Sequence, residues 1–369
     1  MNKFLLDEEQ TVFLRLLRAG LWEQDVEDLS VFPLSTESWR KIFVMSAEQT
    51  VVGIVYRGLH HIPGDCLPPL NLMCRWVAEI DCIERNNRQM NHVLAELIDL
   101  FDKHGIWAVL QKGQGVARMY EYPLLRECGD IDLYFPEKTD FNLACRLIRQ
   151  YNVDVEKASD KARLYCWNGI NVEHHLSLFD IHSPFLRGYL SDLTEKAGFV
   201  GTCISSEDDS MSVTVPSPLL TLLMLSTHIL KHTLGHGIGL RQLCDMARAC
   251  HCLHDSVDGE ELKYVFRRIG LYKWNNLLLW FLTEHLGLAL SDLPYGCIPD
   301  RNADRLLGMV LDRGNFGTRV RKCTGAEEAA WKHKLNTSGS FFRNGVFSMQ
   351  YAASESFWIF SKLLLGQLR

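Results

Sequence analysis

The feature that most constrains the fold is the segment 162–178, ARLYCWNGINVEHHLSL, which predicts a β-hairpin. Asn168-Gly169 separates two runs rich in strand-forming residues, and Asn-Gly is the preferred dipeptide of a two-residue type I′ turn. Side chains alternate between the two faces of a strand, so the second strand has an apolar face and a polar face. These sets are Ile170, Val172, His174 and Leu176, which must face the core, and Asn171, Glu173 and His175, which face solvent.

Hydrophobic periodicity predicts helices before this hairpin. Apolar residues recur every three or four positions in 8–22 and in 36–59, and a longer stripe follows Pro68-Pro69. Proline suits the first turn of a helix, and Gly105 suits the C-terminal cap of the long one.

The pattern changes near residue 106 and becomes helical again after Pro216. Short apolar runs at 106–111 and 130–135 predict strands, and helical patterns separate them from each other and from the hairpin. We therefore predict an α+β protein. Its small mixed-sheet core, 106–205, is expected between an N-terminal helical region, 1–105, and a C-terminal helical region, 206–369.

Composition restricts the class of protein. Of the 369 residues, 47% are hydrophobic, and the net charge of −6 shows no large basic excess. A small molecule or a protein is therefore favoured as partner over nucleic acid, which a local basic patch would still permit. The start has no signal-peptide pattern, the longest apolar runs are too short to span a bilayer, and the twelve cysteines follow no regular framework. We predict a cytoplasmic protein with no membrane segment.

Two aspartates interrupt the predicted strand 130–135, DIDLYF. Asp130 and Asp132 share one strand face, which we expect to be exposed or to line a cleft. Neighbouring carboxylates repel each other unless a cation lies between them, and carboxylate oxygens are ligands that magnesium prefers. Glu173 would complete a metal site if the two strands were neighbours. Spacing alone also permits solvated carboxylates on an ordinary strand face.

The segment 109–120, VLQKGQGVARMY, predicts a strand, a tight glycine turn and a short helix. The free N–H groups at the start of a helix attract phosphate, and Lys112 adds a positive charge there. Arg126 adds another shortly before the aspartates. Gly113-Gln114-Gly115 lacks the third glycine of the dinucleotide-binding motif and the Gly-Lys-Ser/Thr of a P-loop.

These motifs together resemble the uncharacterised nucleotidyltransferases of the DNA polymerase β-like superfamily. The resemblance rests on Lys112-Gly113, Tyr122-Pro123, Arg126, the Gly129–Leu133 stretch GDIDL, and Glu173 with His175. A softer match in the helical part adds His228, Lys231, His232, Arg241 and Asp245, and the likeness covers roughly residues 70 to 250. At the phosphate turn the wider superfamily has Gly-Ser, where this chain has Gly113-Gln114.

The resemblance implies two-metal nucleotidyl transfer from an NTP, with magnesium or manganese, to an acceptor that is a small molecule, a protein or RNA. Asp130 and Asp132 would bridge the ions, and Glu173 would bind the second ion or act as general base. The nucleotide- and phosphate-binding residues would be Lys112, Gly113, Gln114, Arg126, Gly129, His232, Arg241 and Asp245. Alternatives are a catalytically degenerate nucleotide-binding or regulatory protein and a toxin–antitoxin component that modifies a protein or RNA.

Four further patterns each allow a structural interpretation besides a functional one. The cluster of Cys250, His251, Cys252 and His254 lacks a CxxC pair, so a helix end is favoured over zinc. His228 and His232 share a helix face, but no glutamate follows His228 as in HExxH. The glycines 235, 237 and 239 suit a helix connection better than a phosphate loop. Arg241 and Asp245 form either a helix ion pair or part of the cleft.

Overall fold

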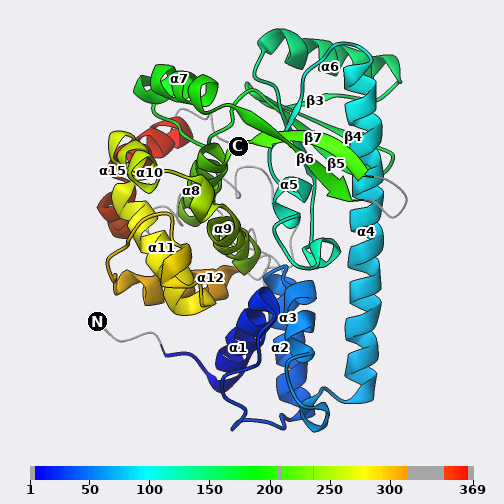
Figure 1. Ribbon diagram of the computed structural model, residues 1–369, viewed down its shortest axis with the longest axis vertical. Coiled ribbons are helices and arrows are strands. Elements are labelled where there is room, and N and C mark those ends of the chain that lie inside the picture. The colour runs from blue at the N-terminus through cyan, green and yellow to red at the C-terminus, as the bar shows by residue number, and fades with distance from the viewer. Residues whose placement is uncertain (1–4, 206–209, 236, 315–344, 365–369) are drawn as a thin grey trace.

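The protein is an α+β protein, in which helices surround a five-stranded mixed sheet and a separate two-stranded ribbon. The computed structural model describes residues 5–205, 210–235, 237–314 and 345–364. Figure 1 shows the sheet beside one end of a long helix, α4, with α1, α2 and α3 at its other end. The helices of the C-terminal part occupy the side of the view opposite α4.

The N-terminal helices match the sequence prediction except for one break. Their bounds are α1 (Glu8–Trp22), α2 (Thr36–Glu48), α3 (Val52–Leu59) and α4 (Leu70–Asp102), with η1 (Gly64–Cys66) before α4. The predicted helical stretch 36–59 divides between α2 and α3, because Thr50 has a positive φ of 53° that no helix accommodates. Pro69 directly precedes α4, and Gly105 has a positive φ just beyond its end, as expected.

The five-stranded sheet has the order β1-β2-β5-β4-β3. Its strands are β1 (Val109–Leu110), β2 (Ile131–Tyr134), β3 (Glu156–Ser159), β4 (Ala162–Trp167) and β5 (Ile170–His175). The hairpin prediction is confirmed: Trp167 pairs with Ile170, and both Asn168 and Gly169 have positive φ. β2 and β5 pair in parallel, while the other pairs are antiparallel. The connection between these parallel strands contains α6 (Lys138–Gln150), β3 and β4.

One face of this sheet is covered by α4 and α6. Phe101 of α4 and Phe141 of α6 both lie against Phe135, at the end of β2. Ile170, Val172 and His174 are buried, as the alternation predicted. The opposite face carries Asp132, Glu173 and His175, so it is the face on which a reactive site can form.

The C-terminal part is mainly helical but begins with a ribbon that the sequence analysis missed. After η3 (Pro184–Leu186) and α7 (Arg187–Ala197), β6 (Phe199–Ser205) pairs antiparallel with β7 (Ser210–Pro216). The predicted helical region 206–369 therefore contains a strand before its first helix. The helices that follow are α8 (Pro218–Leu234), α9 (Leu240–Leu253), α10 (Gly259–Arg268), α11 (Tyr272–Leu286), α12 (Asn302–Arg313) and α15 (Gly345–Leu364), with η4 (His254–Ser256) and η5 (Leu290–Asp292) between them. Within the ranges described, no helix combines the length and the apolar character that crossing a membrane would need.

Candidate active site

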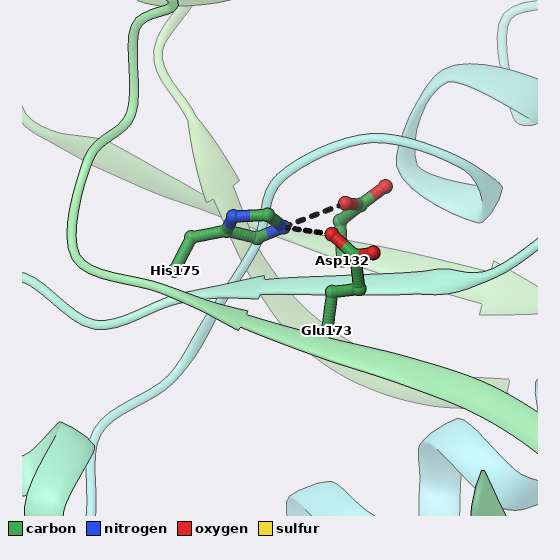
Figure 2. Close-up of side chains that lie close together, drawn as sticks. All are labelled: Asp132, Glu173 and His175. Atoms are coloured by element: carbon green, nitrogen blue, oxygen red, sulfur yellow. Dashed lines mark hydrogen bonds and ion pairs between the residues drawn. The ribbon is translucent and has the colours of Figure 1, made fainter. Parts of the chain in front are cut away.

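The core of the candidate site comes from two neighbouring strands. In the parallel pair of β2 and β5, Asp132 lies opposite Glu173, and Tyr134 lies opposite His175. Figure 2 shows the side chains of Asp132, Glu173 and His175 pointing toward one another from these strands. His175 Nε2 lies 2.8 Å from Asp132 Oδ1 and 3.4 Å from Glu173 Oε2. The sequence analysis made the site depend on these strands being neighbours, and they are.

These three residues have the geometry of a metal site. One ligand atom from each of Asp132, Glu173 and His175 lies within 4.8 Å of the others. Over the described ranges, no other group of three or more such side chains comes this close together. His175 was quoted in the sequence motif but was given no role, and its place two residues after Glu173 was the available signal.

Asp132 is the charge centre of the site. Asp132 is buried, with 3% of the residue exposed, so of the two expected positions, exposed or cleft-facing, an exposed one is excluded for this aspartate. Burial alone would raise its pKa, but Lys112 Nζ at 3.2 Å and the hydrogen bond with His175 hold the pKa below its ordinary value. Burial also disfavours the charged form of Lys112, which lowers its pKa. The negative charges of Asp132 and Asp130 outweigh burial and raise the pKa of Lys112 above its usual range. Asp132 and Lys112 therefore form an ion pair in which Asp132 is buried and Lys112 is partly exposed.

Asp130 directly precedes β2 and is partly exposed. The charge of Asp132, followed by burial, raises the pKa of Asp130 to about 6, against the opposing charges of Lys112 and Arg241. Two carboxylates that influence each other this strongly repel when both are ionised. A bound cation would relieve that repulsion.

A second cluster lies beside the first and includes a residue that the sequence analysis missed. Asp180 follows β5, and its carboxylate lies 2.8 Å from His228 Nδ1 and 2.9 Å from Lys231 Nζ, both on α8. Burial, and then the charge of Lys112, lower the pKa of His228 to about 4. The effect of Lys112 shows that the two clusters share one electrostatic environment. The only sequence signal for Asp180 was its position shortly after β5, the strand that carries Glu173 and His175.

His228 and His232 pack against each other at a ring distance of 4.4 Å. The described residues offer no third ligand that would make this pair a metal site. The two rings thus pack together, which is one of the two arrangements, packing or facing the cleft, that the sequence favoured over a zinc site. Burial lowers the pKa of His232, and among the smaller effects of neighbouring charges Lys112 also lowers it.

Arg126 and Asp245 form a buried bidentate ion pair. Arg126 Nε and Nη2 lie 3.0 and 2.6 Å from the two Asp245 oxygens, and Tyr120 Oη donates to the same carboxylate at 2.8 Å. The ion pair of Asp245 is thus with Arg126, whereas Arg241 Nη1 donates to the Glu127 carbonyl at 2.9 Å. A phosphate-binding role for Arg126 would require this pair to break. The arrangement favours a structural role for Arg126 and Asp245.

The predicted phosphate turn has the expected strand–turn–helix order, although α5 (Gln114–Ala117) is a single turn. Gly113 has φ of 61°, and a Cβ there would lie 3.3 Å from the Asp130 carbonyl oxygen, so glycine suits the position. The Gln114 side chain is buried, and neither of its polar atoms has a hydrogen-bond partner among the described residues. Gly129 is exposed, with open space around its Cα.

Two other sequence patterns have structural explanations. Cys250 is buried at the end of α9, and Cys252 and His254 bond to main-chain carbonyls, so these residues form a helix end and no metal cluster within the described part. Gly235 ends α8 and Gly239 precedes α9, which makes the glycine segment a helix connection.

The sheet and its Asp132, Glu173 and His175 cluster define an α+β protein with a candidate metal site. A family model described as "Uncharacterised nucleotidyltransferase" matches residues 35–287, which is more than half of the chain and includes every site residue discussed. The chain therefore belongs to the uncharacterised nucleotidyltransferase family. No curated protein and no solved structure matches it.

Proposed function

We propose that the protein is a metal-dependent nucleotidyltransferase, which transfers an NMP from an NTP to a hydroxyl group of an acceptor and releases pyrophosphate. The observation that carries this proposal is the cluster of Asp132, Glu173 and His175 on paired strands, with Lys112 beside it. Membership of the family supports the reaction class. We further propose that segment 106–205 is a DNA polymerase β-like core between helical regions 1–105 and 206–369.

The donor atoms fit a divalent cation. Two carboxylates suit Mg²⁺, and the imidazole of His175 also suits Mn²⁺. The raised pKa of Asp130 adds a third carboxylate whose ionisation a cation would favour. Asp132 and Glu173, with Asp130, would hold the metal, and His175 would bind it or orient Asp132. A bound divalent ion would withdraw charge from the phosphates and lower the pKa of the acceptor hydroxyl.

The chain's own residues then have separate roles in the transfer. The acceptor oxygen bonds to the α-phosphorus, and the bond between that phosphorus and the oxygen that bridges to the β-phosphate breaks. The acceptor proton passes to Glu173 where this carboxylate is not a metal ligand. Lys112 stabilises the charge that develops on the phosphates, because its ammonium group is fixed at Asp132 before the substrate binds. The main chain at Gly113 and the unpaired amide of Gln114 supply further donors. We place His232 and Arg241 toward the nucleotide and Gly129 at the open entrance.

The acceptor hydroxyl belongs to a small molecule, a protein or RNA, and we propose that the reaction takes place in the cytoplasm. The described cysteines are all free thiols, which supports a reducing compartment.

The first test is thermal unfolding with ATP, GTP, CTP and UTP, each with and without Mg²⁺, on the wild type and on Asp132→Ala. Ligand that binds only the folded state raises the melting temperature. We expect a Mg²⁺-dependent rise with at least one triphosphate in the wild type. In Asp132→Ala it should be lost, because the buried charge that holds the cation is gone.

Transfer is then measured with the α-labelled form of that triphosphate and candidate acceptors. Full activity in Asp132→Ala would contradict the assignment. Absence of any triphosphate shift in the wild type would instead favour a protein that keeps the fold without the chemistry.

A further inference from the structure

A hollow of about 450 Å³ opens between α6 and β4. Arg163 lies opposite His174 in the β4–β5 pair, so their side chains share one face of the sheet. His174 Nδ1 lies 3.7 Å from Cys145 Sγ of α6, whereas Glu173 and His175 point to the other face. The hollow is therefore separated from the candidate active site by the thickness of the sheet.

Three arginines converge on this hollow. Arg146 and Arg149 are exposed on α6, and Arg163 reaches in from β4. No aspartate or glutamate is among the described residues that line it. Positive charges that converge on one cavity without a carboxylate repel one another, so an anion bound there would be stabilised.

Two of the guanidinium groups are held in place by main-chain carbonyls. Arg149 Nη2 donates to the Val155 carbonyl at 3.2 Å, and Arg163 Nη1 donates to the carbonyls of Ser159 and Ala162 at 2.8 and 2.9 Å. These neutral acceptors orient the side chains but leave their charge in place. Groups fixed in advance lose less entropy when a ligand binds.

The neighbouring charges agree with this description. Burial raises the pKa of the Cys145 thiol, and the charges of Arg149 and Arg163 oppose that shift, so both charges act at the same wall of the hollow. Asp160, an acidic residue near Arg163, is paired with Lys157 at 2.7 Å and is highly exposed.

We propose that this hollow is a second binding site, for a small anion with two or more linked phosphate groups, such as a nucleoside diphosphate or triphosphate. The planar guanidinium group matches the oxygens of phosphate with paired hydrogen bonds, which a lysine cannot provide. The volume lies within the range of small-ligand sites, about 300 to 1,000 Å³. The exposed side chain of Leu143 gives the hollow an apolar surface suited to a nucleoside.

The test is calorimetric titration of the full-length protein with inorganic pyrophosphate and with ATP, both in EDTA. The variants are Arg146→Gln/Arg149→Gln, Arg146→Gln alone, Lys112→Gln in the candidate active site, and Arg85→Gln. Arg85 is a matched control, since it is an exposed arginine on α4 paired with Asp81. We expect the double variant to bind both ligands about tenfold more weakly or worse, with a smaller loss in Arg146→Gln. Arg85→Gln should bind like the wild type, and any binding that Lys112→Gln removes should be the part that the double variant retains.

Three results would overturn the proposal. The first is no binding of either ligand by the wild type. The second is binding that Lys112→Gln abolishes and the arginine variants retain, which would place the anion in the candidate active site. The third is a single-stranded oligoribonucleotide that binds more tightly than ATP and is lost in the double variant, which would make the hollow a nucleic-acid contact. Because the site does not depend on the transfer reaction, failure of either proposal leaves the other standing.

Discussion

At the residue scale, the site shifts the pKa values of two identical side chains, Asp130 and Asp132, in opposite directions. The charge of Asp132, then burial, raises the pKa of Asp130 to about 6. Burial opposes ionisation of Asp132 as well, but Lys112 and His175 keep its pKa low. Asp132 is thus ionised throughout, and its negative charge disfavours ionisation of Asp130 when no cation is bound.

Removing the charge of Asp130 should therefore stabilise the metal-free protein. The raised pKa means that the folded state favours protonated Asp130, so the wild type loses stability as pH rises from about 4 through 6. Without divalent ions at pH 8, we expect Asp130→Asn to be more stable to urea by on the order of 1–2 kcal/mol. The difference should shrink toward pH 4.

The same variant provides its own control when Mg²⁺ is added. The wild type should gain stability from the cation, and Asp130→Asn should gain less, because it offers one carboxylate fewer. A lower stability of Asp130→Asn at pH 8 in EDTA would show that the two aspartates do not repel each other as described.

Residue types and alternation predicted part of this site but not all of it. The i, i+2 spacing of the aspartates and the hairpin faces placed Asp132 and Glu173 correctly. The partners of Asp180 lie 48 and 51 positions away, and Asp245 lies 119 positions from Arg126. Such pairings depend on how helices pack against the sheet, which periodicity does not encode.

At the element scale, the loop after β5 is joined to α8 through Asp180. An Asp180→Asn variant removes the negative charge that holds Lys231 and His228 beside the active site. We expect it to bind Mg²⁺-NTP about tenfold more weakly, the effect of losing one charge-assisted hydrogen bond. The measurement is calorimetric titration with the triphosphate identified by thermal unfolding.

Asp99→Asn is a suitable control for Asp180→Asn. Asp99 is also paired with a lysine, Lys103, but that pair is exposed on α4. Exposed pairs contribute little, so this variant should bind like the wild type. Unchanged affinity in Asp180→Asn would assign the cluster to stability alone.

The close crossing of α1 and α3 depends on glycines. A Cβ on Gly58 would lie 2.1 Å from the Leu16 carbonyl oxygen, a backbone atom that cannot move independently. Gly58→Ala should therefore reduce the free energy of unfolding in urea by about 1–3 kcal/mol. A Cβ on Gly64 would have no neighbouring atom within 4 Å, so Gly64 should tolerate alanine. Equal effects of the two changes would contradict the packing described.

Elements with strong local signals were predictable, and elements that need tertiary contacts were not. Asn168-Gly169 and the stripe of α4 identified their elements directly. The ribbon of β6 and β7 was missed for another reason: Ser210–Pro216 alternates polar residues with Met211, Val213 and Val215, a strand signal that was present but was not used. β1 is only two residues long, and Gly113, whose φ is positive, follows shortly after it and precedes α5.

At the scale of the whole molecule, the buried pair of Arg126 and Asp245 ties the segment before β2 to α9. Removing one partner leaves an uncompensated buried charge, so Asp245→Asn should destabilise the protein by about 3–5 kcal/mol. The measurement is a double-mutant cycle in urea with Arg126→Met and Asp245→Leu. The double variant should recover much of the loss, because it buries no lone charge. A loss from Asp245→Asn below about 1 kcal/mol would show that the pair is not sequestered from water.

The parallel pairing of β2 with β5 also has a consequence for how the protein matures. The hairpin of β4 and β5 joins strands separated by two residues, so it can form early, while Asp132 reaches Glu173 only after the whole crossover has closed. We expect refolding chains to contain Glu173 and His175 in place before Asp132 arrives. Under the proposed function, the assembled site would then be among the last features that a newly made chain acquires.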